Sequence, residues 1–406
     1  MTALFASIAV RPNALDRQVD ALSAHDLLTR PAYELIDPVR AAAAAHLQTT
    51  QLYLWAAALA LQIAVLVWFW SSGRSAQLRD RLRTVAGNNT FLLRLYFGAA
   101  IALIDKVAAF VPLALQYRFF FVMGLNQDLF RTWLAGWLLG TIAAMIVAGL
   151  LAAIVLWLAD RTHQWYIYTM AAIMAGSLLV AFATPIVAFP GLVPPAPGSR
   201  IDRAVHAASA LTRVDGPVSV QRVSQRSRIG YSYVTGLGPT LRVVISDTAS
   251  LSETAGELRF RIVNAFLWAY DNVALQLALV QGAFIVLGAA LAVGISDRIG
   301  FRRDDDPISR LALLGAIIGL AYVIALPFYN SYSRNLDNAA DDRAIAVTHD
   351  PAAAIRLQVR RADQALVAVC PDMFTLWFLT PHSSPGPRIA SFQGKPDSDS
   401  CAKPHP

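Results

Sequence analysis

The chain has 406 residues, of which 56% are hydrophobic and 15% are charged, and its mean hydropathy is +0.47. Ordinary soluble domains carry about 25% charged residues, so this composition excludes that class and predicts a polytopic membrane protein. The net charge of +7 comes from scattered arginines, with no basic cluster interleaved with aromatic residues. This distribution argues against nucleic acid as a partner.

Residues 1–46 form a polar to amphipathic N-terminal segment, for which we expect short helices broken at Pro31 and Pro38. Four apolar stretches then predict transmembrane helices within residues 47–193, and two more within residues 273–329, because a bilayer needs about 20 apolar residues. The predicted spans are 52–70, 95–117, 132–159, 165–189, 273–295 and 311–328.

The polar segment 194–272 lies between the fourth and fifth spans. Its three β-like runs, 218–223, 231–235 and 241–246, are punctuated by Gly236 and Gly238, which predicts a hairpin in a small sheet. A helix over 257–270 should follow and lead into the fifth span. The fold class expected is mainly α, a polytopic helical membrane protein with a small hairpin-containing subdomain.

After the sixth span, residues 330–382 contain a second charged helix. Residues 383–406 are rich in Ser, Pro, Gly and Lys, which predicts a disordered tail. Cys370 and Cys401 have no CxxC neighbour, which excludes a zinc knuckle and leaves a disulfide between them open.

Topology stays open at this level. The Arg-rich loops 71–90 and 296–310 would lie on one side, which the positive-inside rule makes cytoplasmic, but the N-terminal 46 residues carry arginines as well. Because two spans separate the helix at 257–270 from the helix at 331–345, both helices are expected at the same membrane face.

Five stretches in order along the chain resemble the integral-membrane zinc CAAX prenyl endopeptidase family. They are 121–133, 226–248, 257–270, 333–341 and 380–392. The family's zinc-binding helix reads roughly ExxxVxAHExxHY, its second helix SRxxExxAD, and its closing segment HPxxxxRI. The resemblance implies a zincin-like subdomain beside the spans, with a zinc ion bound where these helices meet.

The residues needed for that chemistry are replaced at all four positions. Asn264 and Trp268 stand at the two zinc-binding His positions, Ala265 at the general-base Glu, and Asp337 at the third ligand. An Asn amide is a poor zinc ligand, Ala cannot abstract a proton, and an indole offers no free acceptor nitrogen. We therefore expect no zinc cofactor, with Asp337 the one weak metal candidate.

Neighbouring positions of the family's site are retained. Asp341 stands where the family has an aspartate that orients a zinc-bound His, and His382 and Arg388 stand where the resemblance implies oxyanion stabilisation. Without zinc, the plainer expectation is that Asp341 pairs with Arg334 or Arg343 and that His382 is exposed. We expect the Trp268 ring to fill the zinc volume, with Asn264 within hydrogen-bond reach of Asp337 or Asp341.

Three functions remain in competition. The leading hypothesis is a catalytically inactive metallopeptidase homologue of the membrane, which binds a polypeptide or a lipidated segment. An active metalloendopeptidase with a rearranged site would use Asp337, Asp341 and His382. A lipid- or small-molecule-binding protein would use a wet chamber marked by Asp105-Lys106 and Asp271. The lipid bilayer is the expected environment, as a multi-pass protein of a bacterial inner membrane.

Overall fold

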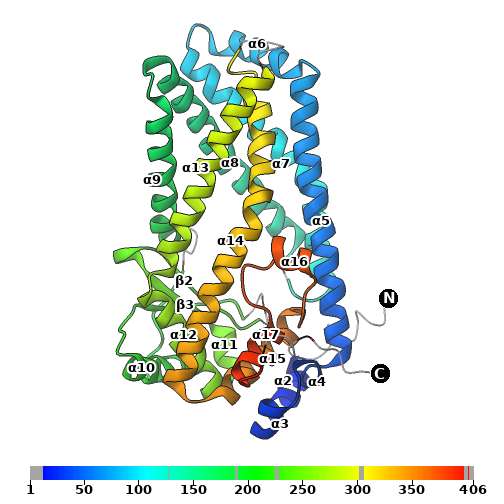
Figure 1. The fold of residues 1–406 in the computed structure, drawn as a ribbon, viewed down its shortest axis with the longest axis vertical. Helices are drawn as coiled ribbons and strands as arrows, with labels where there is room; N and C mark the ends of the chain where they lie inside the picture. The colour runs from blue at the N-terminus through cyan, green and yellow to red at the C-terminus, as the bar shows by residue number, and fades with distance from the viewer. Residues whose placement is uncertain are drawn as a thin grey trace.

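The computed structural model describes residues 12–126, 128–187, 191–224, 227, 229–300, 306–396 and 401. Its long axis is formed by six helices that stand side by side (Figure 1). They are α5 (Pro38–Ser71), α7 (Thr90–Val122), α8 (Phe130–Arg161), α9 (Trp165–Val187), α13 (Val273–Gly300) and α14 (Leu311–Thr348). All six are long and apolar enough to cross a membrane, which agrees with the six predicted spans.

Short helices lie at the two ends of this bundle. The helix α6 (Arg74–Ala86) connects α5 to α7 at one end. At the opposite end lie α2 (Pro12–Ala21), α3 (Ala24–Thr29) and α4 (Ala32–Leu35), together with the sheet (Figure 1). The bundle therefore has one small end and one end with a folded subdomain.

The helix α14 runs through both layers of the molecule. Its 38 residues rise about 57 Å at 1.5 Å per residue, well beyond the ~30 Å hydrocarbon thickness. Its first half is apolar, and its second half carries buried polar side chains that include Ser333, Asp337 and Asp341. One continuous helix therefore joins the subdomain to the membrane-spanning bundle and supplies polar residues to the subdomain.

The subdomain is built on a three-stranded sheet in the order β1-β3-β2. The strand β1 (Val218–Gln221) pairs in parallel with β3 (Arg242–Ser246), and β2 (Ser232–Thr235) pairs with β3 in antiparallel orientation. The predicted hairpin is thus confirmed. Gly236 has a φ of +88°, and a Cβ there would lie 2.2 Å from the carbonyl oxygen of Thr240, so this turn requires glycine.

Three helices complete the segment between the fourth and fifth spans, namely α10 (Arg200–Thr212), α11 (Asp247–Ser252) and α12 (Ala255–Tyr270). Thr254 and Glu257 form a capping box at the start of α12. Phe260, Ile262 and Phe266 are buried in the core that α12 shares with the sheet. This apolar face fixes the rotation of α12, and thereby the direction of its remaining side chains.

The C-terminal part folds back onto this core through α15 (Pro351–Ala365), α16 (Met373–Phe378) and α17 (Pro385–Phe392). The prediction of a disordered tail over 383–406 is wrong for its first part, because Ile389 and Phe392 of α17 are buried in the core. Cys370 and Cys401 form a disulfide, which closes the question left open by the sequence. Residues 397–400 and 402–406 lie outside the described residues.

Two charged groups that suggested a wet chamber have protein partners. Asp105 on α7 accepts a hydrogen bond from the Gln62 side chain on α5 at 2.9 Å. Asp271, at the end of α12, forms an ion pair with Arg343 of α14. Each carboxylate therefore links two neighbouring helices.

Candidate functional site

The helix α12 carries Asn264, Ala265 and Trp268, and it packs against α14. Asn264 and Trp268 are four residues apart, so they share one face of the helix, and both are half-buried, whereas Ala265 is buried. The side-chain Nδ2 of Asn264 donates a hydrogen bond to Oδ1 of Asp341 at 2.8 Å. This contact confirms that Asn264 lies within hydrogen-bond reach of Asp341. It also confirms that the helix of 257–270 and the second charged helix lie at the same end of the bundle.

Asp337 and Asp341 are four residues apart and therefore share one side of α14. Both are nearly inaccessible, with 6% and 2% of their surface exposed. A buried carboxylate is costly unless hydrogen bonds or opposite charges compensate it. Each of the two acids therefore depends on partners from the C-terminal segment.

Asp337 is held by the segment that enters α17. Its Oδ2 lies 2.9 Å from Nδ1 of His382 and accepts a hydrogen bond from the backbone N–H of Ser383 at 3.2 Å. The His382 side chain is 51% exposed, while Asp337 is buried. The imidazole thus closes the outer side of the cluster, and its other face meets solvent, as the sequence predicted for His382.

Asp341 is held by Arg388 from α17. The Arg388 Nη2 lies 2.6 Å from Oδ1 of Asp341, with 9% and 3% of the two side chains exposed. Burial alone would lower the pKa of Arg388, but the charges of Asp341 and Asp337 raise it above its usual value. The predicted pairing of Asp341 with Arg334 or Arg343 is wrong, because the folded-back α17 brings a buried guanidinium to it.

The two other arginines have different partners. Arg334 donates to the carbonyl oxygens of Leu376 and Thr380, each at 2.7 Å, and Arg343 pairs with Asp271. Both side chains therefore bind the outer elements of the subdomain instead of the central acids.

The guanidinium of Arg361 on α15 also interacts electrostatically with Asp337 and Asp341. Burial, with the nearby charges of Arg388 and Arg261, lowers the pKa of Arg361 to about 10. Sequence comparison with the motifs missed this residue, since it lies outside all of them. Its place among the buried residues of α15, an amphipathic helix, was the available signal.

Trp268 lies beside the closing imidazole. Its ring centroid is 6.3 Å from that of His382, with the planes tilted by 48°. The indole thus occupies the side of the cluster where the resemblance implies the second zinc-binding His. That its ring fills the whole zinc volume stays a prediction.

The donor set does not fit a tetrahedral zinc ion. Within the part of the chain that the structure describes, no three His, Cys, Asp or Glu side chains are grouped to hold a metal. Asp337 is already bound to His382 and Ser383, and Asn264 uses its amide nitrogen as a donor to Asp341. Two buried atoms, Oδ2 of Asp341 and Nε of Arg388, have no hydrogen-bond partner, so the network is tight but not fully satisfied.

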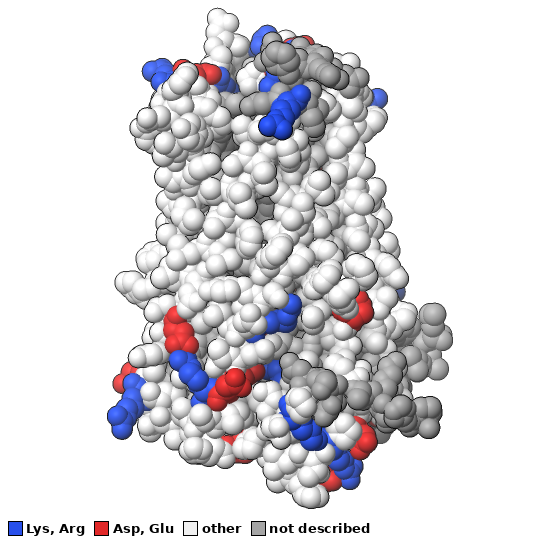
Figure 2. All heavy atoms as spheres, in the orientation of Figure 1, with Lys and Arg blue, Asp and Glu red and all other residues white. Residues whose placement is uncertain are grey.

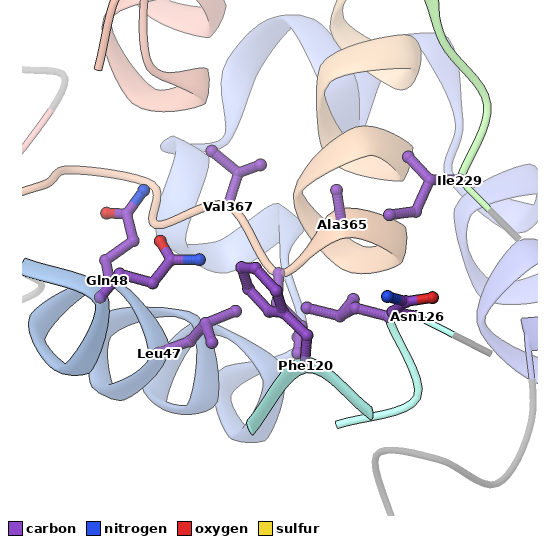
Figure 3. Close-up of a pocket in the computed structure, with 10 residues that line it drawn as sticks. Leu47, Gln48, Phe120, Asn126, Ile229, Ala365 and Val367 are labelled. Atoms are coloured by element: carbon purple, nitrogen blue, oxygen red, sulfur yellow. The ribbon is translucent and has the colours of Figure 1, made fainter. Parts of the chain in front are cut away.

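A separate cavity of about 300 Å³ lies between α5, the end of α7 and the end of α15 (Figure 3). Leu47, Phe120 and Val367 give it an apolar lining, and Gln48 and Asn126 add amide groups. None of the residues of the degenerate zinc site lines it, and neither Asp105 nor Asp271 does.

The strand β2 is at the edge of the sheet and packs against α12, the helix that carries Asn264. The backbone N–H of Ser246 donates to the carbonyl oxygen of Tyr231, so these two residues form a hydrogen-bonded pair. With the register of β2 and β3, this pair determines which residues of β2 bond to β3. In an antiparallel pair, hydrogen-bonded and non-hydrogen-bonded residues alternate along each strand. Ser232 and Val234 therefore direct their N–H and C=O groups away from β3. Both residues are half-buried, and in the described chain no partner occupies these groups.

No family model and no curated protein matches this sequence. A solved structure does match: the crystal structure of Ste24p from S. mikatae superposes with a TM-score of 0.71. The alignment covers 96% of this chain and 98% of Ste24p, at 15% sequence identity. At this identity the similarity shows the fold alone, and it confirms the predicted class, a mainly α, polytopic helical membrane protein with a small hairpin-containing subdomain.

Proposed function

We propose that this protein is a catalytically inactive homologue of a membrane metallopeptidase, which binds an extended polypeptide along β2. The observation that supports it is the closed network at the centre of the fold. Asn264 and Arg388 both bind Oδ1 of Asp341, while His382 and Ser383 both bind Oδ2 of Asp337. The side chains at two of the zinc-ligand positions, Asn264 and Asp337, are thus bound to protein partners.

The loss of chemistry follows from the residue types. A metallopeptidase needs an open metal position and a base beside the bound water. Ala265 has no proton-accepting group, and the indole of Trp268 stands beside His382. Replacing only one of these residues would leave a modified enzyme, whereas replacing all of them removes both the metal and the base.

Peptide binding, in contrast, does not require a metal. An extended peptide that adds to a sheet edge gains main-chain hydrogen bonds, and the outward groups of Ser232 and Val234 offer them. The resemblance to CAAX prenyl endopeptidases suggests a lipidated C-terminal segment as the natural occupant. The protein would then sequester or present such a segment without cleaving it.

The inactivity is tested by zinc quantitation on purified protein beside a peptidase assay. We expect far less than one zinc per chain after dialysis without chelator, and no cleavage of a farnesylated peptide that ends in Cys, two aliphatic residues and a variable residue. About one tightly bound zinc per chain would overturn the proposal.

Binding at β2 is tested with the same peptide, labelled with fluorescein, and the protein in nanodiscs. Val234→Pro removes an outward N–H but no bond to β3, because edge strands tolerate proline with its nitrogen toward solvent. We expect it to weaken binding about tenfold or more, since one lost hydrogen bond and a blocked approach exceed 1.4 kcal/mol. Val234→Ala is the matched control and should bind like the unmodified chain.

A second candidate function has a specific observation in its favour. Asp337 orients an exposed His382 through Nδ1, which is the arrangement of a general base. An active enzyme with this rearranged site would cleave the peptide and lose activity in Asp337→Ala. Cleavage that survives Asp337→Ala would exclude this candidate as well.

A further inference from the structure

We infer that the end of the molecule with the sheet and the polar cluster faces the oxidising, extracytoplasmic side of its membrane, and that it takes its polypeptide partner from that side. The inference about orientation stands on two independent features, the single cysteine pair and the arginine distribution. The statement about the partner also rests on the proposed function.

The first feature is the disulfide. The chain has two cysteines, and both are consumed in the Cys370–Cys401 bond, whose Cα atoms are 5.8 Å apart. Cys370 follows α15 in the subdomain and packs against α17, since a Cβ at Gly386 would lie 2.7 Å from its Sγ. Disulfides of this structural kind persist in oxidising compartments and are rare in the cytosol.

The disulfide also lies next to the candidate site. The backbone N–H of Gly386 donates to the carbonyl oxygen of Val369, directly before Cys370. Gly386 belongs to α17, which also carries Arg388, the partner of Asp341. The bond therefore fastens the segment that holds the cluster, and its compartment is also the compartment of the site.

The second feature is the arginine content of the opposite end. In Figure 2, Lys, Arg, Asp and Glu gather at both ends of the face shown, and the band between them is without these colours. The connections at the small end hold arginines within a few residues of the spans. Among the residues that the structure describes, these are Arg74, Arg79, Arg81, Arg83, Arg161, Arg298 and Arg310.

Positive residues in short loops, within about 20 residues of a span, mark the cytoplasmic side. Counted from the apolar stretch 52–70 of the first span, only Arg40 lies within 20 residues on the N-terminal side, against four arginines of 74–83 on the other. The short connection from α7 to α8 has Arg118 and Arg131 beside it, which is fewer than either the 71–90 or the 296–310 connection carries. The long segment 188–272 crosses the membrane largely regardless of charge.

The two features agree on one orientation. The small end with α6 is cytoplasmic, and the subdomain with β2, Asp337 and Asp341 is outside. A partner that reaches β2 is accordingly an extended polypeptide segment exposed on the oxidising side.

The test uses a matched pair of surface positions in the full chain. Leu251 on α11 and Val85 on α6 are each 73% exposed and lie at opposite ends. In a Cys370→Ser, Cys401→Ser background, Leu251→Cys and Val85→Cys are probed in intact bacterial cells with a membrane-impermeant maleimide. We expect labelling of Leu251→Cys and none of Val85→Cys before lysis, with both labelled after it.

The reverse pattern, or equal labelling of both positions in intact cells, would overturn the inference. Should the cysteine-free background fold poorly, fusions to the unmodified chain after residue 406 decide the same question. Alkaline phosphatase should be active and green fluorescent protein dark there, and the opposite result would overturn it. Neither readout depends on peptide binding, so a failure of the proposed function would be seen separately.

Discussion

Asn264 of α12 and Asp341 of α14 are joined by a 2.8 Å hydrogen bond across 77 residues of sequence. Where the resemblance implies a zinc-bound His oriented by an aspartate, an amide donates to that aspartate directly. The helix pairing of the fold is thus kept, while the group at its centre is changed.

Arg388→Gln should destabilise the protein strongly. It leaves Asp341, 2% exposed, without its ion partner, and breaking a buried pair in this way costs about 3 to 5 kcal/mol. Denaturant unfolding in detergent measures the loss. The double variant Arg388→Gln, Asp341→Asn should recover part of it, because the uncompensated charge is then gone.

Arg343→Gln is the control for this experiment. It breaks the pair with Asp271, whose side chains are 43% and 31% exposed, and exposed pairs contribute less than about 1 kcal/mol. Equal losses in Arg388→Gln and Arg343→Gln would contradict the central role of the Asp341–Arg388 pair.

Restoring the four replaced positions should create a metal site. We expect the variant Asn264→His, Ala265→Glu, Trp268→His, Asp337→Glu to bind about one zinc per chain, because two His at i and i+4 with a carboxylate from a second helix complete the ligand set. Asp341 is in place to orient the new side chain at 264. Elemental analysis of the purified variant measures the metal.

The same variant with Asp337→Ala in place of Asp337→Glu serves as its control, and it should bind zinc far more weakly. A correctly folded four-position variant that takes up no zinc would show that α12 and α14 do not present these positions as the resemblance implies.

Acid should selectively weaken the connection between β1 and β2. Burial raises the pKa of Asp247, but hydrogen bonds from Val223 and Ser224 outweigh it and hold the pKa below its ordinary value. A carboxylate whose pKa is lower in the folded than in the unfolded protein stabilises the fold at every pH above the unfolded-state pKa. This stabilisation is lost as the pH falls through the folded-state pKa. The melting temperature of the unmodified chain should therefore approach that of Asp247→Asn below about pH 4.

The comparison is made in one detergent from about pH 7 to about pH 3. A difference between the two proteins that stays constant over this range would mean that the Asp247 carboxylate does not stabilise the connection.

Reduction should loosen the C-terminal segment. The disulfide closes a loop with a sequence separation of 31, for which loop-closure entropy gives about 3 to 4 kcal/mol. Thermal unfolding with and without reductant measures the effect. The variant Cys370→Ser, Cys401→Ser should match the reduced protein and should not respond to reductant, and a response in that variant would assign the effect to another cause.

The spans and the hairpin were predictable because their signals are local. Long apolar runs and alternating β-branched residues bounded by glycines restrict the chain within a few residues of themselves. The same holds for the shared face of Asn264 and Trp268, since a helix places residues i and i+4 side by side whatever lies opposite. The candidate positions of the cluster were therefore found from sequence.

The prediction of a disordered tail was wrong because it relied on local composition alone. Residues 383–406 have a composition typical of disorder, yet α17 buries Ile389 and Phe392 against the core. Local composition cannot report a surface formed by distant helices, nor that Cys401 lies near Cys370.

By itself the sequence determined the membrane class, the order of the elements and the absence of the zinc-binding residue types from their motif positions. Only the tertiary structure decided which partner each buried group has: Arg388 for Asp341, and His382 for Asp337. Many arginines and acids are chemically equivalent along the chain, and the choice among them depends on which surfaces the packing of α12, α14 and α17 brings within a few ångströms.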